Sequence, residues 1–166
     1  MPVGLQNDEN ARIATAETLT MAIWHQPVGN DAMKQSADAV RRVLVMDDED
    51  QLRKVVGRML QFLGHEVTTT ASGEEAIEEF QQALNEEQPF DLVILDLTVF
   101  GGLGGKDALV GMLAIDPGVK AIASSGYAGD DVIDNFAEFG FAGALAKPYR
   151  INDLRDKIAS VMGPGE

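Results

Sequence analysis

Leu92-Val93-Ile94-Leu95-Asp96 is the stretch that decides the fold of this chain. Four consecutive apolar residues followed at once by a carboxylate predict a short strand that is buried on both faces. Asp96 then lies at the C-terminal end of that strand, which is where open α/β sheets bind their ligands. The glycine-rich segment 98–105 behind it predicts a flexible loop rather than the interior of a strand or helix.

Strand-like and helix-like patterns alternate on both sides of this stretch, from Arg41 onward. Each predicted helix repeats apolar residues at helical spacing and ends near a glycine or proline. We expect strands at 43–46, 67–70, 92–96, 119–123 and 143–146, and helices within 52–63, 72–84, 108–113, 132–140 and 154–161. Five βα units in about 120 residues imply an α/β fold with a doubly wound parallel sheet and helices on both faces.

Residues 1–40 differ in composition from the rest of the chain and contain no strand-like apolar run. Asn10 is placed to cap a short helix that reaches about Trp24, and Pro27 follows shortly afterwards. We therefore expect an N-terminal extension or linker at 1–40, with at most one short helix, and a folded domain at 41–163.

The composition argues against several classes of function. The formal net charge of −14, from 27 acidic and 13 basic residues, repels phosphate backbones, so we expect no direct nucleic-acid binding. No apolar run approaches the roughly 18 residues of a membrane span, and the N-terminus lacks the pattern of a secretory signal. The absence of cysteine excludes disulfides and thiolate chemistry and is consistent with a cytoplasmic protein.

Chemically active residues follow four of the predicted strands. These residues are the pair Asp47-Asp48, then Asp96, Ser125 and Lys147. All strands of a parallel sheet end at one edge, so these residues converge. Three carboxylates close together repel one another, and a hard divalent cation, most simply Mg²⁺, would supply the counter-charge. A lysine and a hydroxyl opposite suit a phosphoryl group bound between metal and protein.

With these motifs the chain resembles the receiver domains of two-component response regulators, over about residues 41–162. The spacing supports the resemblance, with 29 positions from Asp96 to Ser125 and 22 from Ser125 to Lys147. Each motif alone is weak, but four in the right order at strand ends are specific. The resemblance implies a flavodoxin-like sheet with strand order 2-1-3-4-5.

The resemblance also implies a metal site and an acceptor. Asp96 would take a phosphoryl group from a phosphohistidine on a sensor histidine kinase or phosphotransfer protein. Asp48 and Asp96 would ligate Mg²⁺ directly, and Asp47 would act through water. The backbone carbonyl of Thr98 would be a further ligand.

Two more residues would respond to the phosphoryl group. Lys147 would pair first with Asp96 and then with the phosphate, and receivers usually have a cis bond before the following proline, here Pro148. Ser125 would move to hydrogen-bond the phosphate and pull its loop inward. A local change of charge would then be read out by an element with two states.

The chain departs from the receiver pattern at two positions. Receivers commonly have a proline four residues after the acceptor, where this chain has Phe100, a change we expect to affect loop stiffness. Three residues before the lysine they often have a tyrosine or phenylalanine that turns inward on activation, and this chain has Ala144. The aromatic half of the usual switch is therefore absent.

Two other functions remain open from the sequence. A phosphatase of the haloacid dehalogenase class uses similar residues, but it places the acidic pair last and needs an aspartate where this chain has Thr98. A receiver-like module that binds partners without phosphorylation is favoured by Ala144 and opposed by the complete pocket. The segments around Asp96 and Ser125 look most like receivers attached to hybrid sensor kinases, so a stand-alone receiver and a fragment of a hybrid histidine kinase both stay open.

Overall fold

The computed structural model describes residues 39–127 and 129–163 of the chain. The predicted extension at 1–40 therefore lies outside the described residues, apart from its last two positions. The strands are β1 (Arg42–Met46), β2 (Glu66–Thr70), β3 (Leu92–Asp96), β4 (Ala121–Ser125) and β5 (Gly143–Ala146). The helices are α2 (Asp50–Phe62), α3 (Gly73–Asn85), α4 (Gly105–Ile115), α5 (Asp131–Asp134), the 3-10 helix η1 (Phe136–Phe139) and α6 (Ile151–Met162).

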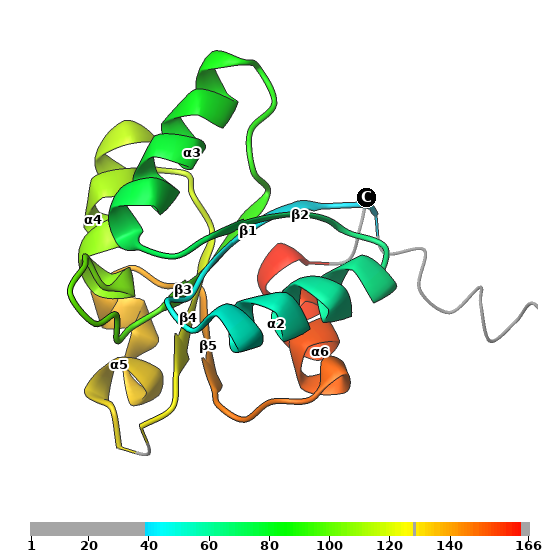
Figure 1. Cartoon of the computed structure of the whole chain (residues 1–166), viewed down its shortest axis with the longest axis vertical. Helices are drawn as coiled ribbons and strands as arrows, with labels where there is room; N and C mark the ends of the chain where they lie inside the picture. The colour runs from blue at the N-terminus through cyan, green and yellow to red at the C-terminus, as the bar shows by residue number, and fades with distance from the viewer. Residues whose placement is uncertain (1–38, 128, 164–166) are drawn as a thin grey trace, which may run out of the picture. The chain divides into compact units, whose positions relative to one another are not determined.

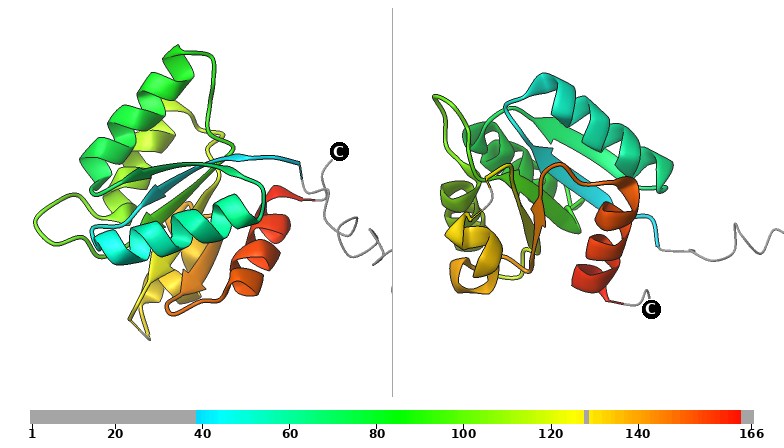
Figure 2. Two further views of the ribbon diagram at one scale, coloured as in Figure 1. Left: turned by 45° about the vertical axis from the view of Figure 1, so that its right-hand side comes forward. Right: turned by 90° about the horizontal axis from the view of Figure 1, so that it is seen from below.

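The five strands form one parallel sheet in the order β2-β1-β3-β4-β5, which confirms the predicted fold class and strand order. Helices α3, α4 and α5 cover one face of the sheet, and α2 and α6 cover the other (Figures 1 and 2). Within the described residues, no helix is long and apolar enough to cross a membrane.

Each face of the sheet has its own apolar core, because successive side chains of a strand point to opposite faces. In β1, Leu44 and Met46 pack toward α3 and α4, while Val43 and Val45 pack toward α2 and α6. All five residues of β3 are buried, as the continuous apolar run predicts for a central strand. The two cores enclose β3 on both faces and thereby fix its last residue, Asp96, at the edge of the sheet.

Two elements differ from the prediction. Strand β4 is displaced by two residues, so Ser125 is its last residue instead of lying in the loop behind it. The helix predicted around Val132 is only four residues long, and a 3-10 turn follows it before Gly140, at φ +88°, ends the segment. Apolar spacing alone suggested a longer helix, but Asp and Asn side chains compete with the helical backbone for hydrogen bonds, and Asn135 leaves the helical conformation.

The glycine-rich loop exists between β3 and α4, and close packing explains its last two glycines. A Cβ on Gly104 would lie 2.6 Å from the carbonyl oxygen of Leu97, and one on Gly105 would lie 2.6 Å from that of Asp96. Gly105 is also the first residue of α4 and is buried. Glycine is therefore required here so that the chain can return close to the end of β3, rather than for flexibility alone.

Candidate functional site

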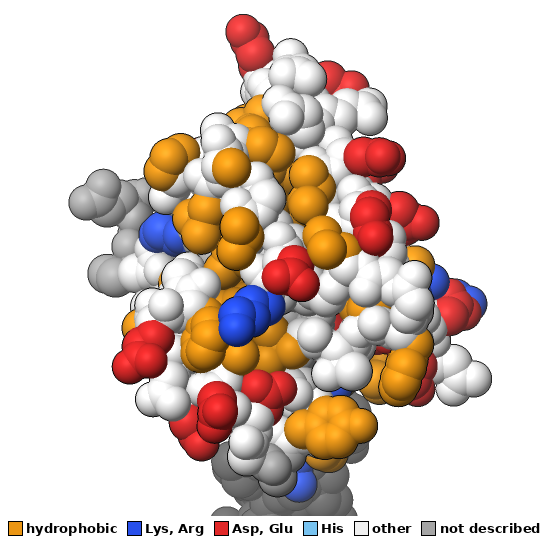
Figure 3. Space-filling view, turned by 90° about the vertical axis from the view of Figure 1, so that its left-hand side faces the viewer, with side chains coloured by type: hydrophobic (Ala, Val, Ile, Leu, Met, Phe, Trp, Pro, Cys, Tyr) orange, Lys and Arg blue, Asp and Glu red, His pale blue; other side chains and the backbone are white. Residues whose placement is uncertain are grey.

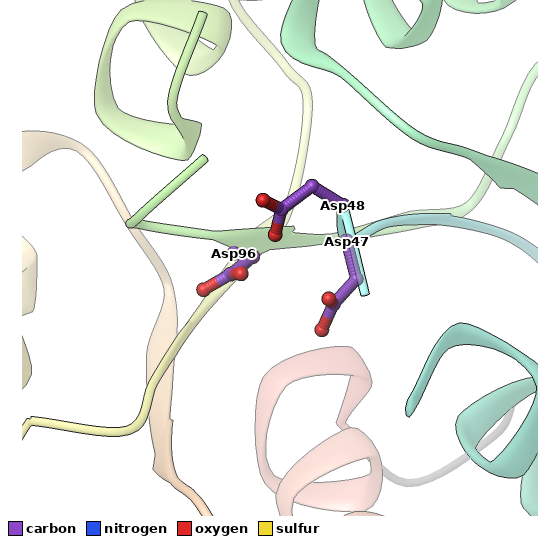
Figure 4. A group of neighbouring side chains, drawn as sticks. All are labelled: Asp47, Asp48 and Asp96. Carbon is purple, nitrogen blue, oxygen red and sulfur yellow. The ribbon is translucent and has the colours of Figure 1, made fainter. Parts of the chain in front are cut away.

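Three carboxylates converge at the C-terminal edge of the sheet. Asp47 and Asp48 directly follow β1, and Asp96 ends the adjacent strand β3. One oxygen from each lies within 4.8 Å of the others, and the side chains turn toward a common space (Figure 4). Asp47 and Asp96 are only 4% and 5% exposed, and Asp48 is half-buried. The predicted convergence of these residues is therefore present in the structure.

Lys147, directly after β5, supplies a cation to this cluster. Its Nζ lies 2.7 Å from Asp47 Oδ2 and 3.3 Å from Asp96 Oδ2, so the shorter of the two contacts is to Asp47. Burial by itself would lower the pKa of Lys147, but the hydrogen bond to Asp47 and the charges of both carboxylates outweigh it, so the pKa is raised. Lys147 is therefore positively charged at neutral pH. The peptide bond to Pro148 is cis.

Asp96 is held in surroundings that disfavour its ionised form. Burial raises its pKa above the ordinary value of an aspartate, the charge of Lys147 opposes this, and the charge of Asp47 adds to it. The donors that reach its carboxylate are Lys147 and the N–H of Thr98, the latter at a long 3.4 Å. Three carboxylates and one lysine leave a negative excess in a buried space, so a divalent cation fits the chemistry of the donor set.

Asp48 makes a contact that follows from the departure at position 100. Its Oδ2 accepts a hydrogen bond of 3.0 Å from the backbone N–H of Phe100, whose ring is 84% exposed. Proline has no N–H, so a chain with the usual proline could not make this bond. The sequence prediction considered only the stiffness of the loop and missed this donor.

Other backbone groups hold the acids and the loop in place. Asp47 Oδ1 accepts from the N–H of Glu49 at 2.9 Å. Glu74, at the start of α3, accepts from the N–H of Leu103 at 3.0 Å, and this bond lowers the pKa of Glu74. Thr98 lines the same pocket as Asp48 and Asp96. Glu74 was not among the predicted residues, and a link between α3 and the glycine-rich loop has no local signal in the sequence.

Ser125 is buried, at 1% exposure, but its hydroxyl is not directed to Asp96. The Oγ donates to Asp130 Oδ2 at 3.0 Å and accepts from the N–H of Tyr127 at 3.2 Å. Asp130 was not among the predicted site residues. The available signal was an aspartate directly before a helical segment, which is a common N-cap.

A pocket of about 530 Å³ opens beside the cluster. Asp48, Asp96 and Lys147 line its polar end, and α2 lines its apolar side with Leu52, Val55 and Met59. The pocket also includes Phe100 and Tyr127, both exposed, and Tyr149, which is half-buried. Burial raises the pKa of Tyr149, so this ring is neutral at physiological pH. The carboxylates are thus reached from outside past an apolar wall.

Comparisons with known proteins identify the family of this chain. The family model of the response regulator receiver domain matches residues 43–159. Sporulation initiation phosphotransferase F of Bacillus subtilis (strain 168) is 28% identical over 117 residues, which cover 70% of this chain and 90% of that protein. Sensor kinase CckA of Brucella abortus (strain 2308) is 33% identical over 123 residues, covering 72% of this chain but only 12% of that protein.

The fold of this chain is also similar to that of solved structures. The response regulator protein TrrA from Thermotoga maritima, in complex with Mg²⁺-BeF, has a TM-score of 0.62 and 25% identity, over 74% of this chain and 99% of that chain. The haloacid dehalogenase alternative finds no support, because the match covers the whole series of strands with the acidic pair first. This chain belongs to the response regulator receiver domain family, the phosphorelay modules of two-component signal transduction.

Proposed function

We propose that Asp96 accepts a phosphoryl group from the phosphohistidine of a sensor histidine kinase or phosphotransfer protein, in a Mg²⁺-dependent reaction, and that the change is read by a protein partner. The observation that carries this proposal is the buried Asp96 carboxylate, which forms one cluster with two further carboxylates and Lys147. The domain at 41–163 would be the functional unit, with 1–40 as an extension.

The proposed transfer is a displacement at phosphorus by a carboxylate oxygen. An oxygen of the Asp96 carboxylate attacks phosphorus, and the bond between phosphorus and the imidazole nitrogen of the donor breaks. The electron pair returns to that nitrogen. With a proton on the other ring nitrogen of the donor, this leaves a neutral imidazole on the donor and an acyl phosphate on Asp96. Lys147, whose ammonium group already lies beside the Asp96 carboxylate, would then pair with a phosphoryl oxygen instead.

Mg²⁺ fits the residues present. We propose that Asp48 and Asp96 hold it directly, with the carbonyl of Thr98, and that Asp47 acts through water. Asp47 suits the indirect role because Lys147 and the N–H of Glu49 already contact its two oxygens. When bound, the ion would offset part of the negative charge of the carboxylates and of the phosphoryl oxygens. That the relative TrrA was solved in complex with Mg²⁺-BeF supports the choice of Mg²⁺ as the ion.

The donor protein is proposed to approach over the pocket beside α2. That route offers apolar side chains next to Asp96, with Val55 and Phe100 exposed. The distribution of charge favours the same side, because the incoming phosphoryl group is negative. Residues 73–139 hold 14 acidic and two basic residues, whereas the remaining described residues, which include α2 and α6, hold seven acidic and nine basic residues. Figure 3 looks onto the α3, α4 and α5 side and shows acidic side chains around a central apolar area. Because the phosphoryl group of such relays originates from ATP, we propose the cytoplasm as the compartment.

The test is intact-mass spectrometry after incubation with acetyl phosphate and Mg²⁺. We expect a single phosphate adduct on the wild type, none on Asp96→Asn and none when a chelator removes Mg²⁺. Asp107→Asn is the matched control, because Asp107 is an exposed aspartate on α4. The proposal would be rejected if Asp96→Asn still formed the phosphate adduct, or if the wild type formed none.

A binding module that works without phosphorylation is the second candidate, and Ala144 favours it. Ala144 leaves no aromatic ring on β5 to report the state of the pocket. Equal affinity for a partner before and after phosphorylation would support this candidate. The chain spans 90% of phosphotransferase F but 12% of CckA, so a stand-alone relay protein and a segment of a hybrid histidine kinase are both proposals.

A further inference from the structure

The hydroxyl of Ser125 has a partner that competes with phosphoryl chemistry. A serine has one O–H donor, and Ser125 uses it on Asp130 Oδ2 at 3.0 Å. The N–H of Tyr127 donates to the same oxygen at 3.2 Å. Because the side chain is buried, water does not offer it a ready alternative. Ser125 therefore cannot donate to a phosphoryl oxygen on Asp96 while its bond to Asp130 persists.

Asp130 connects this hydroxyl to helix α5. Its second oxygen, Oδ1, accepts from the N–H of Val132 at 3.1 Å, and Asp130 is thereby the N-cap of the helix. Val132 is buried in the core shared with α3 and α4. The two oxygens of one carboxylate thus hold Ser125 on one side and a core-anchored helix on the other. Asp130 cannot follow Ser125 toward Asp96 without giving up its cap.

The bond between Ser125 and Asp130 is expected to be strong for its type. Hydrogen bonds to a charged acceptor are shorter and stronger than those between neutral groups. The bond is partly buried, so solvent weakens it only in part. With Ala144 in place of an aromatic ring, β5 has no aromatic side chain whose movement could accompany that of Ser125. The exchange of acceptors at Ser125 is then the step that the phosphoryl group itself must drive.

We propose that Asp130 is a positioning residue that holds the Ser125 hydroxyl away from Asp96 until the phosphoryl group competes for it. The inference rests on the proposed function of Asp96. It predicts that Asp130 slows formation of the acyl phosphate, since its bond to Ser125 must break, and that phosphorylation loosens the link between β4 and α5. The effect requires the hydroxyl of Ser125 and disappears without it.

The experiment compares Asp130→Ser with the wild type, using acetyl phosphate and Mg²⁺ and following the phosphate adduct by intact mass. Serine is also a good N-cap, so α5 keeps its first-turn bond. Its side chain is shorter and carries one neutral oxygen in place of the two oxygens of a carboxylate, so the separate acceptor that Asp130 Oδ2 offers to Ser125 is lost. We expect adduct formation to be faster by about three- to tenfold, as loss of a hydrogen bond to a charged group allows. Asp134→Ser, which removes the same charge from an exposed position of α5, should leave the rate unchanged.

A second background separates positioning from a general effect on folding. In Ser125→Ala, the additional change Asp130→Ser should not alter the rate, because no hydroxyl remains to be released. An equal acceleration in both backgrounds, or none in either, would overturn the inference while leaving phosphorylation of Asp96 intact. If neither the wild type nor Asp130→Ser forms an adduct, the proposed function fails and the inference fails with it.

Discussion

Lys147 and Ser125 lie at the ends of the neighbouring strands β5 and β4, yet only the polar group of Lys147 contacts the carboxylate cluster. Lys147 already lies between Asp47 and Asp96, at 2.7 and 3.3 Å. Ser125 donates instead to Asp130, the N-cap of α5. The charged partner of the pocket is in position before any phosphoryl group arrives, and the neutral partner is not.

The physical reason for this difference is the range of the two interactions. Buried carboxylates attract a lysine strongly through a medium of low dielectric constant, so Lys147 has no competing position of similar energy. A hydroxyl gains only a short-range hydrogen bond, and it goes to the nearest good acceptor, here Asp130. In this domain, charge organises one half of the site and leaves the other half free to change with phosphorylation.

The largest expected effect on stability comes from removing Lys147, the cation of the half of the site that charge organises. Lys147→Met keeps the length of the side chain but leaves Asp47 and Asp96 buried without their cation. We expect the free energy of unfolding without Mg²⁺ to fall by about 3 kcal/mol, as for a broken buried ion pair. Mg²⁺ should bind more tightly and restore most of the loss, because no positive charge competes with it. Urea denaturation with a chelator and at increasing Mg²⁺ measures both.

Ser125→Ala provides the comparison for that experiment. It removes one hydrogen bond to a carboxylate that keeps its contact with Val132, so the loss should be about 1.5 kcal/mol, at the lower end for a bond to a charged group, and independent of Mg²⁺. If the two variants were equally destabilised, or if Mg²⁺ rescued both, the contrast between the two halves of the pocket would be wrong.

A smaller effect is expected at Asp96, and its sign is opposite. The pKa of Asp96 is raised in the folded protein, so the folded state resists ionisation of this group. Its contribution to stability is fully present below the ordinary pKa of an aspartate and is lost as the pH rises through the raised value. Asp96→Asn mimics the protonated form and should therefore raise the Tm of the Mg²⁺-free protein by a few degrees at neutral pH.

The pH series is the critical measurement for Asp96. The gain in Tm of Asp96→Asn over the wild type should shrink as the pH is lowered toward the range where free aspartate is protonated. Saturating Mg²⁺ should also reduce the gain, because the ion stabilises the wild-type carboxylate. A variant less stable than the wild type without Mg²⁺ would show that the pairing with Lys147 outweighs the burial of Asp96.

Most of the fold was predictable because its signals are local. The apolar run 92–95 and the helical spacing of Leu52, Val56 and Leu60 each reflect a single buried strand or face, and these elements formed where expected. Around Val132 the apolar spacing was equally clear, but the polar side chains between these positions stopped the helix after four residues. Apolar periodicity indicates which face of a segment is buried, but it does not indicate how far the helical conformation of the backbone extends.

For the candidate site, the sequence predicted which charged residues meet but not their hydrogen-bond partners. Strand ends determine that Asp47, Asp96 and Lys147 meet, since their positions follow from the order of the sheet. Hydrogen-bond partners such as Asp130 for Ser125 depend on a rotamer and on the exact path of a loop. Such details leave no pattern in the sequence, although they decide which partners the side chains of the site have before phosphorylation.

The smallest expected effect tests whether Asp48 belongs to the organised half with Lys147. The N–H of Phe100 donates to Asp48 Oδ2, so Phe100→Pro removes a donor that orients this carboxylate. Groups that orient metal ligands typically contribute about tenfold or more to metal affinity, and for this exposed loop we expect Mg²⁺ to bind about two- to fivefold more weakly. Isothermal titration calorimetry measures the change, and Phe100→Ala, which keeps the N–H, should bind Mg²⁺ like the wild type. Equal weakening in both variants would assign the effect to the lost ring. Tighter binding of Mg²⁺ in Phe100→Pro would mean that the N–H competes with the ion for Asp48, so that Asp48, like Ser125, must exchange partners.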